Sequence, residues 1–434
     1  DASDADTLAE ELKRATTRNY RAYQSDLERI DGAETAEASP LIPRDTTQFL
    51  TTLHPLPADA HGPTNEVPTY FRLPVEDGEY YVVSAQSVLA PQVNTRATDS
   101  LYINAELVER DDLDTRYRCT GDGYESAHDG VNGIVTGTVY SRTIGQDCNT
   151  DELMLLLKRR GDWRQTEPID VEVTVTRIDP FTLPDGRDAE PAAEADPALT
   201  VSPSTDTPAA TTPGVWFSDA VDLTPGETVA VDIVAGETQF FRVPADYGQQ
   251  VLGQLQVRDD AQNWDAYTHE RRLELTAYNE ARAELPLTED VIFPEPEAVL
   301  DFGYTDPIFF QNRYEGTNRG FDARKLWQDG DQYLTVRYGD TTQGTINAAS
   351  QLPPITYHLT LEVEGQPQPG PTFHPVDGRS EEETTTAEPT AEVDPDVTAQ
   401  EAEDNGGGMG LWLGIGAVVL VLLGAGGFAL SRRS

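Results

Sequence analysis

The sequence contains few of the residues that most often carry metal sites and covalent cross-links. Its 434 residues include two cysteines and six histidines, and only three of its basic residues are lysines. Two cysteines exclude a cysteine-rich zinc module and a dense disulfide scaffold. Three lysines argue against isopeptide links within the chain, and no HExxH string joins the histidines.

Positive charge is also scarce. The chain has 31 basic and 76 acidic residues, which gives a net charge of −45. Such a surface repels phosphate backbones, so we expect no nucleic-acid partner. The excess of acid and the preference for arginine over lysine are typical of a GC-rich genome or of adaptation to high salt.

The motifs of the common catalytic and nucleotide-binding sites do not occur. There is no GxSxG, GxGxxG or GxxxxGK[ST] string, and no pair of carboxylates stands out in so acidic a chain. We therefore predict that the protein is not an enzyme and holds no cofactor. Calcium is one alternative, because acid-rich loops of extracellular β-domains can supply oxygen ligands, and a metal pair at His54 and His61 is another. The candidate calcium ligands are Asp111, Asp112, Asp114, Asp122, Asp329 and Asp331.

One long apolar run lies near the C-terminus. Residues 409–430 carry no charge, and 22 helical residues at about 1.5 Å each span a hydrocarbon core of roughly 30 Å. Arg432 and Arg433 follow in a short tail, 431–434, and basic residues mark the cytoplasmic side. We predict a single-pass protein of the plasma membrane with its N-terminus outside. The sequence begins at Asp1, so we expect a processed form or fragment whose signal peptide is absent from this chain.

Three segments outside the apolar run have distinctive compositions. Residues 1–31 are predicted to form an N-terminal amphipathic helix over 4–29, with an apolar stripe at helical spacing. Residues 183–212, rich in Pro, Ala and Thr, are predicted to be a linker, and 366–408 an acidic disordered stalk. The stripe consists of Leu8, Leu12, Tyr20, Tyr23 and Leu27.

The segments 32–182 and 213–365 are related by an internal repeat. The stretch from Gly32 to Thr46 matches the stretch from Gly214 to Thr228, at an offset of 182 positions. The aromatic block that begins at Tyr70 matches the block at Phe240, at an offset of 170. Three further blocks follow in the same order: 101–103 with 273–275, 159–162 with 337–340, and 168–175 with 354–361.

Within these blocks apolar and polar residues alternate. Ile169, Val171, Val173 and Val175 share one face, whereas Glu172 and its polar neighbours share the other, which is the period of a half-buried strand. We predict a mostly β protein with two tandem antiparallel β-sandwich or jelly-roll domains. The other predicted strands are 79–88, 101–109, 152–159, 227–234, 249–257, 271–279 and 332–338.

The start of the second repeat resembles a known family. Leu223-Thr224-Pro225-Gly226-Glu227, followed by the stretch from Gly236 to Pro244, is similar to the opening of bacterial pre-peptidase C-terminal β-sandwiches. The tandem arrangement with an anchor also resembles the membrane-proximal half of actinobacterial surface proteins that carry a von Willebrand factor A domain. The resemblance implies extracellular binding or assembly. The D-x-S-x-S metal motif of that domain does not occur in this chain.

Two further pairs of residues are candidates for structural or binding roles. Cys119 and Cys148 both fall in the first repeat, and an oxidising compartment favours a disulfide between them. Trp163 and Trp264 lie in polar loops, where an indole can contact a sugar or a protein partner.

These features predict a non-catalytic, membrane-anchored protein of the cell envelope. Its tandem β-sandwiches would bind other envelope proteins or a wall polymer. One alternative is that they form the stalk of a larger surface protein whose N-terminal domain, similar to von Willebrand factor A, carries the activity. A second alternative is an enzyme such as a glycan or peptide hydrolase.

Overall fold

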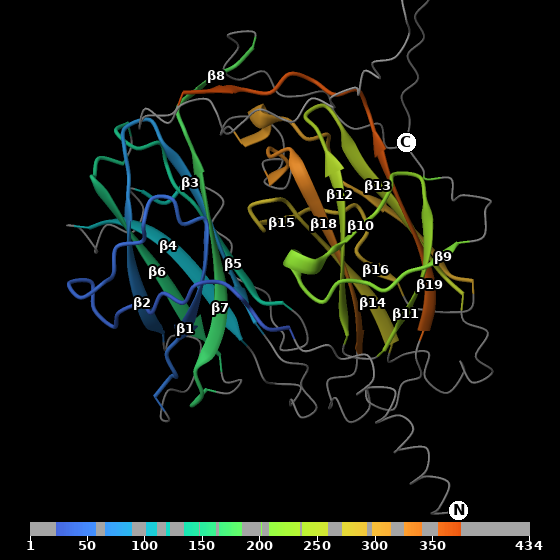
Figure 1. The fold of residues 1–434 in the computed structure, drawn as a ribbon, viewed down its shortest axis with the longest axis horizontal. Helices are drawn as coiled ribbons and strands as arrows, with labels where there is room; N and C mark the ends of the chain where they lie inside the picture. Colours follow the sequence, from blue (N-terminus) through green and yellow to red (C-terminus); the bar gives the residue numbers. More distant parts are fainter. Residues whose placement is uncertain are drawn as a thin grey trace, which may run out of the picture. The chain divides into compact units, whose positions relative to one another are not determined.

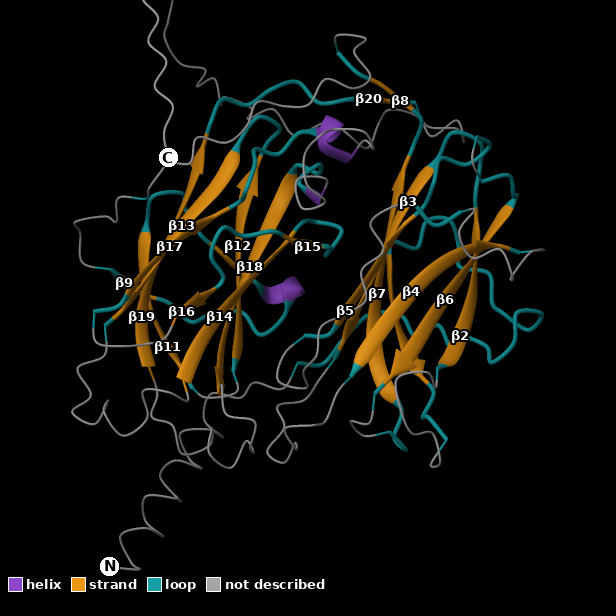
Figure 2. Ribbon diagram, turned by 180° about the vertical axis from the view of Figure 1, so that it is seen from behind, coloured by secondary structure: helices purple, strands orange, loops and turns teal. Residues whose placement is uncertain are grey.

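The structure is a computed structural model, and the part that it describes forms two β-sandwiches (Figures 1 and 2). The two lie within one compact unit, residues 1–379. The described residues are 23–57, 66–88, 101–110, 119–121, 134–146, 148–161, 165–184, 201, 208–234, 237–258, 271–292, 297–313, 325–340 and 355–374.

The first sandwich consists of two antiparallel sheets, each named here by its central strand. The β7 sheet has the order β1 (Gln48–Leu53), β7 (Ile169–Ile178), β3 (Tyr80–Ser87) and β5 (Thr136–Tyr140). The β6 sheet has the order β2 (Val67–Pro74), β6 (Glu152–Arg160) and β4 (Tyr102–Glu109). Apolar side chains of both sheets form one buried cluster between them, which includes Phe49, Phe71, Leu155 and Val173.

The second sandwich repeats this plan with extra short strands. Its β19 sheet has the order β17 (Val299–Gly303), β13 (Gln250–Val257), β19 (Ile355–Glu364), β11 (Thr228–Ile233) and β9 (Ala209–Ala210). Its β18 sheet has the order β10 (Val221–Asp222), β12 (Thr238–Ala245), β18 (Gly330–Asp340), β14 (Arg271–Tyr278) and β15 (Glu284–Leu285), with β16 (Val291–Ile292) also on β14. Strand β9, which pairs with β11, lies within the predicted linker 183–212.

The two sandwiches have the same strand order. The order β1-β7-β3-β5 corresponds to β11-β19-β13-β17, and β2-β6-β4 corresponds to β12-β18-β14. Every strand predicted from alternation is present, with its ends shifted by at most three residues. The reason is that one face of each strand packs into a core, which imposes a period of two on the sequence.

The register of the first repeat block differs by one residue from the sequence prediction. The Ile42 amide donates to the Arg72 carbonyl, and the Leu223 amide donates to the Arg242 carbonyl, each at 2.8 Å. Leu223 therefore corresponds to Ile42, at an offset of 181, and not to Leu41. Burial explains the difference, because Ile42 and Leu223 are buried whereas Leu41 is 46% exposed.

The prediction of an N-terminal helix is wrong for its last part. Residues 23–29 are not helical, and Arg29 forms a β-bridge with Leu50. The Ile30 amide donates to the Leu50 carbonyl, and the Leu50 amide donates to the Glu28 carbonyl, each at 2.9 Å. The backbone of this segment therefore forms hydrogen bonds with the edge strand β1 instead of the hydrogen bonds of a helix. Residues 1–22 lie outside the described residues.

The other predicted segments lie mostly beyond the described part. Among the residues that the structure describes, none forms a helix long and apolar enough to cross a membrane, and the predicted span 409–430 is not among them. In the predicted stalk 366–408, the described residues include β20 (Thr372–Phe373), which pairs with β8 (Phe181–Thr182) at the end of the first sandwich.

Candidate functional site

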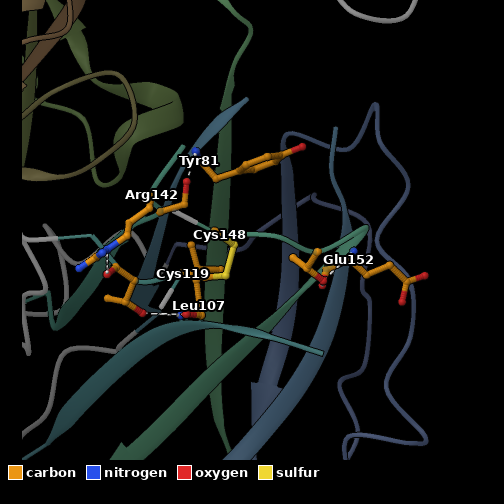
Figure 3. Close-up of a disulfide and its surroundings, with 9 residues drawn as sticks. Tyr81, Leu107, Cys119, Arg142, Cys148 and Glu152 are labelled. Atoms are coloured by element: carbon orange, nitrogen blue, oxygen red, sulfur yellow. Dashed lines mark hydrogen bonds between the residues drawn. A yellow bond between two sulfur atoms is a disulfide. The ribbon is translucent and has the colours of Figure 1, made fainter. Parts of the chain in front are cut away.

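The predicted disulfide is confirmed. Cys119 and Cys148 are bonded and fully buried in the first sandwich (Figure 3). The Arg142 amide donates to the Cys119 carbonyl at 2.8 Å, and the Thr120 hydroxyl donates to the Leu107 carbonyl at 2.7 Å. These hydrogen bonds tie the segment around Cys119 to β4 and to the end of β5, and the disulfide joins it to Cys148 ahead of β6, which is a structural role.

The predicted contact residues and most of the calcium candidates are not among the described residues. These are Trp163, Trp264, Asp111, Asp112, Asp114 and Asp122. Asp331 is described, and its carboxylate is paired with Arg242 at 2.9 Å. Within the described ranges no three His, Cys, Asp or Glu side chains are grouped so that they could hold a metal ion.

The outer face of the β7 sheet packs against the outer face of the β18 sheet. We call this contact the junction. An aromatic cluster from the second sandwich, which contains Trp216, Phe217, Phe240 and Tyr278, reaches Val88 and Ile134 of the first sandwich. The facing positions of the β7 sheet are polar but buried, and they are Ser84, Gln86, Thr138, Glu172 and Thr174.

An ion pair between Glu172 and Arg282 lies in the junction. The Arg282 Nη1 atom donates to Glu172 Oε2 at 2.7 Å, and the two side chains are only 5% and 1% exposed. The Trp216 indole donates to the same oxygen at 2.7 Å, and the Ser25 hydroxyl donates to Oε1 at 2.6 Å. The Tyr23 hydroxyl also donates to Oε1. Each carboxylate oxygen thus accepts two hydrogen bonds, which is what a buried charge requires.

These hydrogen-bond donors set the ionisation of the Glu172 carboxyl group. Burial alone would raise the pKa of Glu172, but hydrogen bonds from Ser25, Tyr23 and Trp216 and the charge of Arg282 hold it below its ordinary value. Burial and the hydrogen bond to Glu172 raise the pKa of Tyr23 to about 12. At neutral pH the junction therefore holds a carboxylate, a guanidinium and a neutral phenol.

A tight turn between β14 and β15 presents Arg282 to the junction. Arg282 has a φ of 58°, in the left-handed region, and its amide donates to the Asn279 carbonyl at 2.8 Å. The Gln86 side-chain amide donates to the Arg282 carbonyl at 3.1 Å, and the guanidinium lies 4.9 Å from the centre of the Phe217 ring. The strained backbone, of order 1 kcal/mol, is held by contacts from both sandwiches.

A polar pocket of about 360 Å³ opens beside the junction. Its walls come from the rim of the first sandwich, including Arg44, Tyr81, Arg177 and Asp179, and from Glu280 and Gln328 of the second. Burial and the neighbouring acids Asp331 and Asp329 raise the pKa of Glu280.

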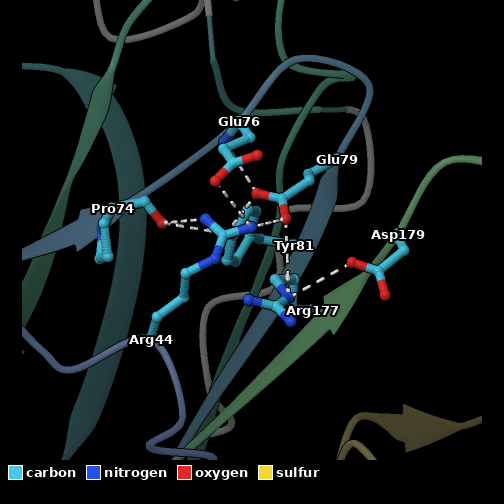
Figure 4. Close-up of polar contacts among 7 residues, drawn as sticks. All are labelled: Arg44, Pro74, Glu76, Glu79, Tyr81, Arg177 and Asp179. Carbon is cyan, nitrogen blue, oxygen red and sulfur yellow. Dashed lines mark hydrogen bonds and ion pairs between the residues drawn. The ribbon is translucent and has the colours of Figure 1, made fainter. Parts of the chain in front are cut away.

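Behind this wall lies Glu79, which is fully buried (Figure 4). The Tyr81 hydroxyl and the Glu76 amide each donate to its Oε2 at 2.8 Å. Arg44 donates to Oε1, and the Arg177 Nε atom lies 3.6 Å from the same oxygen. Burial and the charge of Glu79 raise the pKa of Tyr81.

Sequence reasoning did not single out the residues of the junction and the pocket. The available signal was the near absence of charge on one face of the β7 sheet, where Glu172 stands among hydroxyl and amide side chains. A second signal comes from the repeat. The positions equivalent to Glu79, Tyr81 and Arg177 hold Gln249, Val251 and Val363, since Tyr81 pairs with Arg177 as Val251 pairs with Val363.

No family model matches the sequence, and no curated protein matches it. Among solved structures, the chain is similar to the ANXUR2 extracellular domain of Arabidopsis thaliana, with 9% identity and a TM-score of 0.17, over 74% of this chain and 92% of that one. It is also similar to tandem CBM51 modules of a family 98 glycoside hydrolase from Streptococcus pneumoniae. That match has 9% identity and a TM-score of 0.19, over 72% of this chain and 88% of the other.

Proposed function

We propose that the protein is a non-catalytic component of the cell envelope whose two sandwiches act as one body that binds another envelope protein or a wall polymer. The observation that carries this proposal is the buried Glu172–Arg282 pair, through which the sheet faces of two repeats pack together. Two sandwiches held in this way present their loops and free faces in a fixed relation, which reduces the entropy lost when a large partner binds.

The cellular location belongs to the same proposal. The uncharged run 409–430 with two arginines behind it supports a membrane anchor and an extracellular position for the sandwiches. The disulfide between Cys119 and Cys148 supports an oxidising compartment. The resemblance to actinobacterial surface proteins with pre-peptidase C-terminal sandwiches supports the same location.

A second candidate is a spacer within a larger surface protein, and one observation favours it. The segment that leaves the second sandwich returns to the first, where β20 pairs with β8. The His374 amide donates to the Pro180 carbonyl at 2.6 Å, and the His374 ring lies 3.0 Å from the Thr182 hydroxyl. A pull on the C-terminal segment would thus act on both sandwiches together, which suits a stalk.

Binding of the full-length protein, purified in detergent, to wall polysaccharide and to envelope proteins of its host tests the proposal. We expect saturable retention on one of these. The Asp301→Asn variant, which changes an exposed carboxylate on β17, serves as the matched control and should bind as the wild type does. Turnover of a glycan or peptide that one carboxylate substitution abolishes would contradict a non-catalytic role. Absence of retention on both materials would favour the spacer.

A further inference from the structure

The pocket beside the junction has the size of a small-molecule site. Its volume of about 360 Å³ lies within the range of roughly 300–1,000 Å³ that such sites occupy. Most of its wall comes from the first sandwich, and Glu280 and Gln328 close it from the second. A ligand in this pocket would therefore touch both repeats.

The wall of the pocket is fixed before any ligand arrives. Glu79, which is fully buried, accepts from Tyr81 and from the Glu76 amide at 2.8 Å each and also accepts from Arg44. Its Oε1 lies 3.6 Å from Arg177 Nε, so the arginine is oriented by a carboxylate behind it (Figure 4). Side chains held in this way lose little freedom when they bind a ligand.

Three polar atoms of the pocket residues have no hydrogen-bond partner in the described part of the chain. They are Nη1 of Arg177, a donor, Oδ1 of Asp179, an acceptor, and the hydroxyl Oγ1 of Thr174. All three atoms are buried, and Asp179 Oδ1 lies 3.5 Å from Nε of Arg177. Buried polar atoms are nearly always hydrogen-bonded, so a donor and an acceptor left side by side in a pocket point to a ligand that supplies both functions.

The pocket is lined by charges of both signs, Arg44 and Arg177 beside Asp45 and Asp179, and this mixture selects against ions. An anion that approaches Arg177 also meets Asp179, and a cation that approaches Asp179 also meets Arg177. The opposite wall adds a carboxyl, Glu280, whose pKa is raised. A neutral group avoids both repulsions. Adjacent hydroxyl groups satisfy the arrangement, because one hydroxyl oxygen can accept from a guanidinium while the next hydroxyl donates to a carboxylate.

We propose that this pocket binds a neutral sugar unit, with one hydroxyl accepting from Nη1 of Arg177 and the neighbouring hydroxyl donating to Oδ1 of Asp179. The inference rests on the proposed binding role and names the chemistry that a wall polymer would present to it.

The fold itself does not require these pocket residues. In the second sandwich the same strand positions hold Val251 and Val363 in place of Tyr81 and Arg177, and the strands pair in the same register. The buried polar wall is thus an addition to the first repeat, which is what a site specific to one repeat predicts.

The test measures binding of neutral methyl glycosides to the full-length protein, in a detergent without a sugar headgroup, by ligand-observed NMR and calorimetry. The probes are methyl α-mannoside, methyl β-galactoside and methyl α-arabinoside, with the deoxy analogues that lack one hydroxyl of a vicinal pair. We expect at least one glycoside to bind. Asp179→Asn and the matching deoxy analogue should each weaken that binding about tenfold or more.

Two further variants make the test specific. Glu280→Gln changes the opposite wall and should weaken the same glycoside severalfold. Asp301→Asn alters an exposed carboxylate outside the pocket and should leave binding unchanged. Thermal unfolding of each variant, compared with the wild type, shows whether any loss of binding comes from unfolding.

The outcomes separate this inference from the proposed function. The inference is overturned if no glycoside saturates, or if the bound glycoside is insensitive to both Asp179→Asn and Glu280→Gln in folded protein. Retention of wall polysaccharide that survives both substitutions would overturn the pocket assignment and leave the binding role intact. Glycoside binding that depends on Asp179, without retention of any wall polymer or envelope protein, would support the pocket and contradict the proposed function.

Discussion

Glu172 of the first sandwich and Arg282 of the second form a buried ion pair, with 2.7 Å between Oε2 and Nη1. Glu172 lies on a strand that the sequence marks as half-exposed, and Arg282 lies in a turn with a positive φ. Their contact joins the faces of two repeats. It is the basis for treating the two sandwiches as one body.

Removal of one partner of this pair should be costly. Glu172→Leu or Arg282→Leu leaves the other charge buried and unpaired, and we expect a loss of about 3–5 kcal/mol in the free energy of unfolding. The double variant should recover much of this loss, because neither charge remains. Denaturant unfolding of the four proteins gives the coupling energy. Single variants that lose under 1 kcal/mol would show that the pair is not buried in solution.

The junction should respond to high pH through Tyr23. Its folded pKa, about 12, lies above its ordinary value of 10.0 because burial and Glu172 favour the neutral phenol. The stability it contributes is therefore complete below pH 10 and is lost as the pH rises through 12. Unfolding measured between pH 9 and pH 12.5 should show a loss that Tyr23→Phe reduces. An equal loss in both proteins would contradict this assignment.

Low pH should act on the same network through Glu172. Its folded pKa lies below the ordinary value of 4.5, so its contribution is complete above pH 4.5 and is lost as the pH falls through the lower folded value. In Glu172→Gln the free energy of unfolding should therefore fall less as the pH is lowered than it does in the wild type. Asp301→Asn, which changes an exposed carboxylate on β17, is the control and should lose stability at low pH as the wild type does.

The corrected repeat register predicts a contrast between two adjacent residues. Ile42 is 1% exposed and Leu41 is 46% exposed. Ile42→Asp buries an unpaired charge and should cost about 4 kcal/mol or more, whereas Leu41→Asp should stay within about 0.5 kcal/mol. Chemical denaturation of both variants makes the comparison. Equal losses would favour the register in which Leu41 corresponds to Leu223.

The disulfide should contribute to stability without any role in binding. Its bond closes a loop between residues 29 positions apart, and we expect Cys119→Ser with Cys148→Ser to cost about 3–4 kcal/mol. Unfolding with and without reductant checks the value. A variant as stable as the wild type would contradict it, and so would a change in ligand affinity in the folded protein.

The sequence was sufficient for the strands and the repeat because each strand has one face in a core. Alternation of apolar and polar residues records that burial directly. The helix prediction over residues 23–29 was wrong because Tyr23 is partly buried by stacking on Trp216, at 4.7 Å between ring centres, and not by a helical face. An apolar residue at helical spacing does not reveal what covers it.

The junction and the pocket could not be predicted from alternation alone. Glu172 occupies a polar position of its strand, and polar positions look the same whether water or a second domain covers them. The pocket joins Asp179 with Glu280, which are about a hundred residues apart in sequence, so only the packing of the two sandwiches brings them together.

Calorimetric unfolding of the full-length protein tests most directly whether the two sandwiches form one body. If the junction couples them, the sandwiches should unfold in one transition, with a calorimetric enthalpy close to the van't Hoff enthalpy. Glu172→Leu should broaden or split that transition. Two separate transitions in the wild type, each with about half of the enthalpy, would contradict the account, because the repeats would then unfold as independent domains.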